Sequence, residues 1–379
     1  MIATLSGFAS LYFATFLLMI GSGLINTYMA LRLSAESVSE VWIGLLISGY
    51  YLGQVIGARI GHRLIIRAGH VRAYLAAGAL ATCVILAQTL ITEVPAWVCL
   101  RLVAGVAMVV QFMATESWLH EQTENHHRGR VLSLYLVMSG VGTALGQLSI
   151  TLYPTLDLRP LTFAAICQAM SLIPIALTAR RHPAAQMPAP LDLKYFLQHV
   201  PAPMITVFLA GAICGSYYGL AAVFAVKMGL TTNQVATYIA TGVIAGLISQ
   251  WPMGWLSDRV GRAGLIRVNA SLFCVIALLM WGWVAWPFWV MLLFSAALGV
   301  LQFTLYALAS GLANDSIEPV RRVGMSAIVL MTYGVGACLG PIAAGGLMRL
   351  GGPGMFYVFA SICALVLIVV IGKKTTTTQ

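Results

Sequence analysis

The sequence predicts an all-α membrane protein whose twelve transmembrane helices form two pseudo-symmetric six-helix bundles. Only 8% of its 379 residues are charged and 60% are hydrophobic, whereas a soluble domain carries roughly 25% charged residues. The chain also divides into twelve apolar runs, each near the roughly 20 residues that cross a bilayer. Similar phrases recur half a chain apart, as expected of a membrane protein built by duplication.

The apolar runs are separated by short breaks that contain proline, glycine or charged residues. A longer, proline-rich break at 180–202 lies at the midpoint, and we interpret it as a cytoplasmic linker. It separates an N-terminal bundle, 1–179, from a C-terminal bundle, 203–379. The predicted spans are 7–32, 42–61, 73–92, 96–118, 131–153, 160–179, 203–227, 234–256, 265–284, 288–311, 324–347 and 354–372.

Two phrases carry the repeat. The first reads Gly254-Trp-Leu-Ser-Asp258-Arg259-Val-Gly261-Arg262 after the eighth span, and its degenerate counterpart after the second span keeps Arg67 and Gly69 but has Ile66 in place of the acid. The second is glycine-rich, and we expect it to let helices approach closely. Its members are Gly140, Gly142 and Gly146 in the fifth span, and Gly334, Gly336 and Gly340, followed by Pro341, in the eleventh.

The basic residues predict the orientation. With the N-terminus placed in the cytoplasm, sixteen Lys and Arg residues fall at cytoplasmic span ends and four at the opposite ends, as the positive-inside rule requires. The net charge of +10 is therefore scattered over short loops, which argues against a nucleic-acid partner. Both termini are expected on the cytoplasmic side.

These motifs resemble those of the major facilitator superfamily, whose loop signature is Gly-x-x-x-Asp-Arg-x-Gly-Arg. The phrase from Gly254 to Arg262 matches it at every fixed position. Arg101-Leu-Val-Ala-Gly105 is similar to the family's Arg-x-x-x-Gly element in span four, and the glycine-rich phrase is similar to its antiporter element. Ser249-Gln-Trp-Pro252 resembles a small group of uncharacterised bacterial porters of this superfamily.

The resemblance implies two bundles that rock about a cavity lined by spans one, four, seven and ten, so that access alternates between the two sides. The signature residues Gly254, Asp258, Arg259, Gly261 and Arg262, together with Arg67 and Gly69, would form a gate. Arg259 and Arg262 would pair with acids across the seam between the bundles; the candidates are Glu121, Glu124, Asp315 and Glu318. The alternative is that these loop charges only fix the topology.

Glu116 is the one carboxylate placed within a predicted span. An ionisable group in the membrane is a functional candidate by default, and we consider Glu116 the candidate for proton coupling. The alternative is a structural ion pair near the inner surface, with Arg67, Arg72 or Arg128 as its partner.

Arg101 is the one basic residue well inside a predicted span. It lies about 22 Å from Glu116 along one helix, at 1.5 Å per residue, so the two cannot pair. Arg101 either bonds span one, where Asn26 is a suitable acceptor, or holds an anionic group of the substrate. Polar residues on lining spans complete the candidate cavity, although each could equally join helices; the set is Asn26, Arg101, Gln111, Tyr217, Tyr218 and Gln302.

We therefore expect a secondary transporter. The first hypothesis is proton-linked efflux of a small amphipathic organic solute. An importer or uniporter of a small metabolite is the alternative, and a non-transporting membrane sensor is the alternative of another class. We find no phosphate loop or catalytic constellation, so we expect no enzyme and no cofactor. His120, His126 and His127 lack a nearby Cys or another ligand at a suitable spacing, so we expect no metal. The protein is expected to be a monomer in the bacterial cytoplasmic (inner) membrane.

Overall fold

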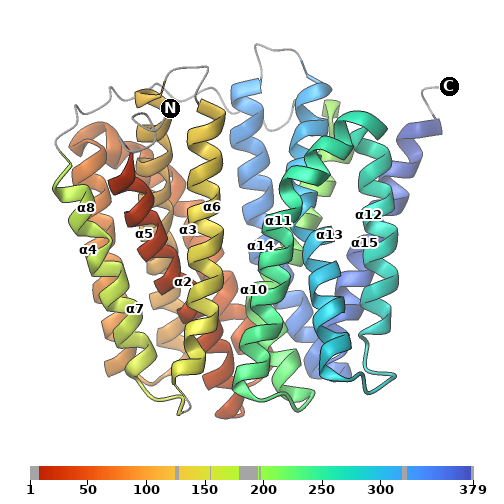
Figure 1. Ribbon diagram of the computed structural model, residues 1–379, viewed down its shortest axis with the longest axis horizontal. Helices are drawn as coiled ribbons and strands as arrows, with labels where there is room; N and C mark the ends of the chain where they lie inside the picture. Colours follow the sequence, from red (N-terminus) through yellow and green to blue (C-terminus); the bar gives the residue numbers. More distant parts are fainter. Residues whose placement is uncertain are drawn as a thin grey trace. The chain divides into compact units, whose positions relative to one another are not determined.

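The computed structural model describes residues 8–123, 128–153, 155–178, 195, 198–317 and 322–376, and within them it contains helices and no strand. Eleven of the described helical segments are long and apolar enough to cross a membrane. Figure 1 shows the helices, which are α2 (Ala9–Ala35), α3 (Glu40–Ala68), α4 (His70–Leu90), α5 (Val94–Gln122), α6 (Arg128–Ser149), α7 (Arg159–Met170), α8 (Leu172–Ala176), α10 (Pro201–Lys227), α11 (Thr232–Val260), α12 (Arg262–Leu279), α13 (Phe288–Asp315), α14 (Arg322–Gly351) and α15 (Met355–Thr376).

The predicted eighth span, 234–256, is a helix but is not among these eleven segments. It corresponds to α11, Thr232–Val260. Polar and aromatic residues interrupt its apolar sequence, including Ser249, Gln250 and Trp251. Length rather than hydropathy therefore identifies this helix as a span.

The predicted sixth span, 160–179, is broken. Helix α7 ends at Met170 and α8 begins at Leu172, with a turn at Ser171 between them. Pro174 has no N–H to donate to the Met170 carbonyl, which removes one rung of the helical hydrogen-bond ladder. At the turn, the Ser171 hydroxyl donates to the Gln168 carbonyl at 2.7 Å.

The chain divides into two compact units. Unit 1 comprises the described residues of Met1–Arg32 and Gly49–Met187, and unit 2 those of Leu33–Ser48 and Pro188–Gln379. The segment Leu33–Ser48 thus groups with the second half of the chain. Most of the predicted linker 180–202 lies outside the described residues.

The signature phrases are helical rather than loops. Helix α3 continues to Ala68 and α11 continues to Val260, so each phrase forms the end of a helix. Gly69 and Gly261 then turn the chain, with φ of 82° and 85°, a backbone conformation that glycine adopts without strain. The repeat in the sequence is therefore also a repeat in backbone geometry.

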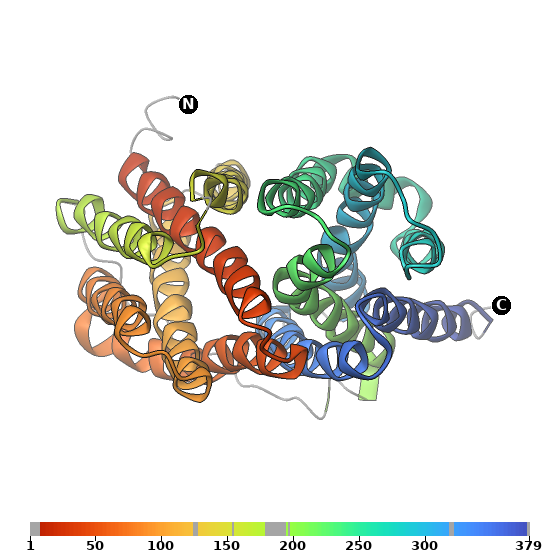
Figure 2. The same ribbon diagram turned by 90° about the horizontal axis from the view of Figure 1, so that it is seen from below.

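Glycines bring paired helices into contact within each unit. In unit 1, a methyl group at Gly142 of α6 would lie 2.7 Å from the Phe16 carbonyl oxygen of α2, and one at Gly146 would overlap the Ile20 carbonyl oxygen. In unit 2, α10 packs along α14, which can be followed in Figure 2. Methyl groups at Gly336 and Gly340 would overlap carbonyl oxygens of α10 there.

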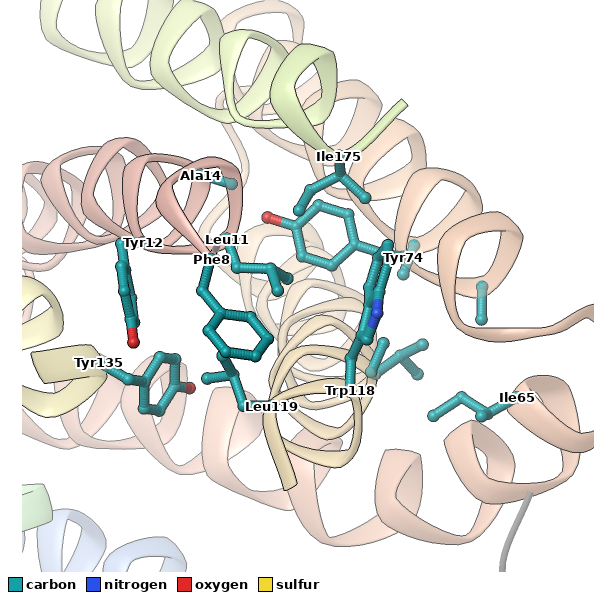
Figure 3. Packing of buried hydrophobic residues seen from close by; sticks show 14 of the residues in the cluster. Phe8, Leu11, Tyr12, Ala14, Ile65, Tyr74, Trp118, Leu119, Tyr135 and Ile175 are labelled. Carbon is teal, nitrogen blue, oxygen red and sulfur yellow. The ribbon is translucent and has the colours of Figure 1, made fainter. Parts of the chain in front are cut away.

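An aromatic cluster fills the core of unit 1 at one end of its helices (Figure 3). Trp118 of α5 and Tyr74 of α4 are almost completely buried in it, and Tyr135 of α6 is 4% exposed. The Tyr12 hydroxyl of α2 donates to the Val131 carbonyl of α6 at 3.3 Å. The cluster therefore fixes α2, α4, α5 and α6 around the segment of α5 that carries Glu116.

Candidate functional site

Arg101 of α5 is held by neutral groups from two other helices of unit 1. Its Nη2 donates to Oδ1 of Asn26 on α2 at 2.6 Å, the acceptor that the sequence suggested. The guanidinium carbon lies 4.3 Å from the ring centroid of Tyr50 on α3. The residue is only 5% exposed, and among the described side chains no carboxylate forms an ion pair with it.

Glycines in the same region set the distance between α3 and α5. A methyl group at Gly105 would overlap the Tyr50 carbonyl oxygen, and one at Gly53 would overlap the Leu102 carbonyl oxygen. The two backbones therefore touch directly, as small residues permit in membrane helices. Because Gly105 is one turn beyond Arg101, this contact brings the Tyr50 ring over the guanidinium.

Glu116 lies near the C-terminal end of α5 and has a neutral partner. The Tyr135 hydroxyl of α6 donates to Glu116 Oε1 at 3.3 Å, and the glutamate itself is exposed on the surface of the protein. Among the described side chains, no cation forms an ion pair with Glu116; this includes the predicted partners Arg67 and Arg72. The side chain of Arg128, the third predicted partner, lies outside the described residues.

Gln111, a third polar residue of α5, lies between helices. Its Oε1 accepts from Gln168 Nε2 of α7 at 3.0 Å, and the residue is fully buried. The bond joins α5 to α7 inside unit 1. This geometry favours the helix-joining alternative over the cavity role.

The remaining cavity candidates come together in unit 2. The Tyr217 ring of α10 packs edge-to-face on Phe303 of α13 at 5.7 Å, and the Tyr218 ring lies 5.6 Å from the same phenylalanine. The Tyr217 hydroxyl donates to the Ile239 carbonyl at 3.1 Å. Gln302 is 2% exposed, and its Nε2 has no hydrogen-bond partner among the described residues.

The signature residues form a charge cluster at the junction of α11, α12 and α13. Arg262 Nη2 donates to Asp258 Oδ1 at 3.1 Å, and Arg262 Nη1 donates to Asp315 Oδ2. Asp315 belongs to unit 2, so this pair does not cross between units as the sequence analysis expected. The side chains of the other candidate acids, Glu121, Glu124 and Glu318, lie outside the described residues.

A pocket of about 190 Å³ lies beside this cluster, between α11 and α13. Gly311 of α13 leaves room for Arg262, since a methyl group there would lie 2.6 Å from its Nε. A methyl group added at Gly254 would meet no atom of another helix within 4 Å, and Gly254 lines the pocket. The lining residues are Gln250, Met253, Gly254, Ser257, Asp258, Arg262, Thr304, Ala307, Leu308 and Gly311.

The other basic residues of the candidate gate differ from Arg262 in their contacts. The guanidinium of Arg259 stacks on the exposed Trp255 ring at 3.8 Å. Arg67 is exposed at the end of α3, and none of the described acids forms an ion pair with it. Among the described residues of the candidate gate, the ion pairs therefore lie in the second-half phrase, which contains Asp258.

One ion pair was not anticipated from the sequence. Lys227 Nζ at the end of α10 donates to Oε1 of Glu40 at the beginning of α3, within unit 2. Glu40 is 6% exposed. The sequence shows an acid at one span end and a base at another, but nothing in it indicates that these two ends meet.

A membrane protein made of two such helical units, with buried polar groups on paired helices, belongs to the class of secondary transporters. Residues 11–313 and 204–378 match the model of the Major Facilitator Superfamily. The chain belongs to this superfamily.

Bacterial relatives match nearly the whole chain. An uncharacterized MFS-type transporter of Enterobacter sp. (strain 638) is 28% identical over 364 residues, 94% of this chain and 93% of that protein. The uncharacterized MFS-type transporter YcaD of Escherichia coli O139:H28 (strain E24377A / ETEC) is 28% identical over 333 residues, 86% of this chain and 84% of YcaD. The predicted resemblance to uncharacterised bacterial porters is confirmed.

Solved transporter structures share the fold. The nucleoside transporter NupG superposes with a TM-score of 0.81 at 14% identity, covering 98% of each chain. A bacterial homologue of the human lysosomal transporter Spinster, inward-facing and occupied, superposes with a TM-score of 0.77 at 12% identity, covering 96% of this chain and 94% of that chain. The predicted fold class is confirmed, and the protein is a multi-pass membrane transporter.

Proposed function

We propose that the protein exports a small amphipathic organic solute across the bacterial cytoplasmic membrane in exchange for protons, by alternating access. Both termini and the linker 180–202 lie on the cytoplasmic side in this proposal, and the working unit is a monomer. The transporter family supports the transport step. The observation that carries the proton step is the environment of Glu116.

Glu116 is suited to exchange a proton because its described hydrogen-bond partner is a neutral phenol. A carboxylate in a fixed ion pair is held in its charged form, whereas one beside a hydroxyl can exist with or without its proton. Glu40 is the other acid within the candidate spans, and it is buried against Lys227. Glu116 is therefore the in-span acid that is free of an ion pair among the described side chains.

The charge cluster of Asp258, Arg262 and Asp315 supports the proposed gate. It ties the ends of three helices together at the junction that contains Gly261. In the proposed cycle, these contacts are formed in one state of the transporter and broken in the other, and transport alternates between the two states.

The test uses purified protein in liposomes that contain a pH-sensitive dye. A thermal-shift screen at pH 6 and pH 8 first selects a solute from aromatic carboxylates, nucleosides and aromatic amines. A gradient of that solute should then move protons in the opposite direction. Glu116→Gln should abolish this proton movement but keep exchange of labelled for unlabelled solute, because exchange requires no net protonation.

Glu93→Gln is the matched control, since Glu93 is exposed at the other end of the same helix. It should behave like the unaltered protein. Solute-driven proton movement that persists in Glu116→Gln contradicts the proton role of this residue. Solute movement without any proton movement in the unaltered protein identifies a uniporter instead.

A further inference from the structure

The guanidinium of Arg101 is buried in unit 1 without a compensating negative charge. Its described hydrogen bond is to an amide oxygen of Asn26 and its described ring contact is with Tyr50, both neutral. Among the residues that are at least nine-tenths buried, the acid present is Glu40, and it pairs with Lys227. Burying a charge is costly unless it is paired, so an opposite charge would be strongly favoured beside Arg101.

The donors of Arg101 are also incompletely used. Nη2 donates to Asn26, whereas Nε, which shares the side edge of the guanidinium with Nη2, has no partner among the described residues. A carboxylate can accept from both donors of such an edge at once. The single amide oxygen of Asn26 occupies one of these two positions.

The Tyr50 ring, which lies against this guanidinium, belongs to an apolar cluster. Leu18 and Met19 of α2, Tyr50 of α3 and Met108 of α5 form one buried cluster, with Tyr51 and Phe112 packed against it. Thioether and aromatic groups adapt to flat apolar surfaces. A ligand that meets Arg101 with one anionic group would therefore meet this cluster with an apolar or aromatic body.

We propose that Arg101 and Asn26 form the binding site for the carboxylate of a monoanionic amphipathic organic acid, with the Tyr50 and Met108 cluster receiving its apolar part. The carboxylate displaces the Asn26 amide oxygen from Nη2 and also accepts from Nε. Asn26 then donates to the carboxylate through its own amide nitrogen. This assignment rests on the proposed transport function, since it names the class of solute that the transporter carries.

The experiment measures binding to the purified protein in detergent by thermal shift and isothermal titration. The probes are benzoate, salicylate, phenylacetate and octanoate, each compared with its neutral amide. At least one acid should bind at least about tenfold more tightly than its amide, as expected when a buried guanidinium meets a carboxylate. Chloride and phosphate are included to test whether a small inorganic anion satisfies the site.

Asn26→Asp is the decisive variant, because it places a carboxylate where the solute's carboxylate would bind. It should fold with an unchanged or higher Tm and bind the acid at least about tenfold more weakly. Asn233→Asp adds the same charge at an exposed position of α11 and should bind like the unaltered protein. Arg101→Gln should lose the preference for acid over amide.

The assignment would be overturned if no probe acid binds, if acid and amide bind equally, or if Asn26→Asp binds the acid as tightly as the unaltered protein. Equal binding of phosphate would also overturn it, since the site would then not select an organic acid. Acid binding that passes these tests without solute-driven proton movement would sustain the site and contradict the proton-linked transport. Proton-linked movement of a neutral solute, without binding of any probe acid, would sustain the proton-linked transport and contradict the carboxylate site.

Discussion

Both in-span charges of α5 have neutral partners, Asn26 and Tyr50 for Arg101 and Tyr135 for Glu116. The separation of about 22 Å along the helix keeps the two charges from neutralising one another directly. Each can therefore take its compensating charge from a mobile species. In the proposed cycle, Arg101 takes it from the solute and Glu116 from a proton.

The pair of Glu40 and Lys227 behaves differently, and it predicts a stability effect. The Glu40 side chain is 8% exposed and that of Lys227 is 40% exposed. Lys227→Met leaves a buried carboxylate without its donor, which should cost roughly 1–3 kcal/mol. Thermal unfolding in detergent should show a lower Tm for Lys227→Met than for Glu40→Gln, which removes the buried charge itself.

Asp157→Asn is the control for this prediction. Asp157 accepts from the Arg159 backbone amide and pairs with its guanidinium, and these contacts hold the pKa of Asp157 below its usual range. Because the pKa of Asp157 is lowered, its charged form stabilises the fold at pH values above the ordinary carboxyl range. This stabilisation is lost as the pH falls through the pKa of the folded state. Because the pair is exposed to water, this contribution is small, so Asp157→Asn should lower Tm at neutral pH far less than Lys227→Met does. Equal losses in the two variants would contradict the burial account.

At the scale of helices, the glycine contacts between α10 and α14 set the packing of unit 2. Gly336 faces the Phe208 carbonyl, with no room for a methyl group, whereas Gly346 on the same helix has no atom within 4 Å of an added methyl. Gly336→Ala should lower stability by roughly 1–3 kcal/mol through overpacking. Gly346→Ala should be neutral or slightly stabilising, as thermal unfolding would show; equal effects would remove the packing role.

The junction of α11 and α12 carries a kinetic prediction. Asp258 and Asp315 flank Arg262, and Gly261 turns the chain between the helices. Asp258→Asn removes a charge from this cluster without touching the Arg101 site. Turnover in liposomes should fall several-fold while solute affinity in detergent stays the same; unchanged turnover would leave this phrase with a topological role only.

Local pattern predicted the helices well but could not predict their ends. Apolar runs mark where the chain can lie in lipid, yet α3 and α11 continue beyond them through the signature phrases to Ala68 and Val260. Polar residues do not stop a helix when its backbone hydrogen bonds are still satisfied. The break at Ser171, in contrast, could have been found from Pro174.

At the scale of the whole molecule, the repeat and composition sufficed to predict the transporter class, but side-chain pairing was only partly predictable. Asn26 was found as the partner of Arg101 because it is a suitable polar acceptor in the first span. Tyr135 and Lys227 were missed as partners, since a phenol or lysine at a span end has many possible neighbours. Pairing depends on how helices rotate and pack, which single-sequence periodicity does not determine.

In the proposed cycle, one site beside Arg101 opens alternately to the two sides of the membrane. Ser22 lies one turn before Asn26 on α2, so Ser22→Cys in a cysteine-free background reports on that site. Right-side-out and inside-out vesicles would be treated with a membrane-impermeant thiol reagent, with and without the solute. With alternating access, the thiol should be labelled from both sides and protected by solute from both. Labelling from one side only, under every condition, would contradict alternating access at this site.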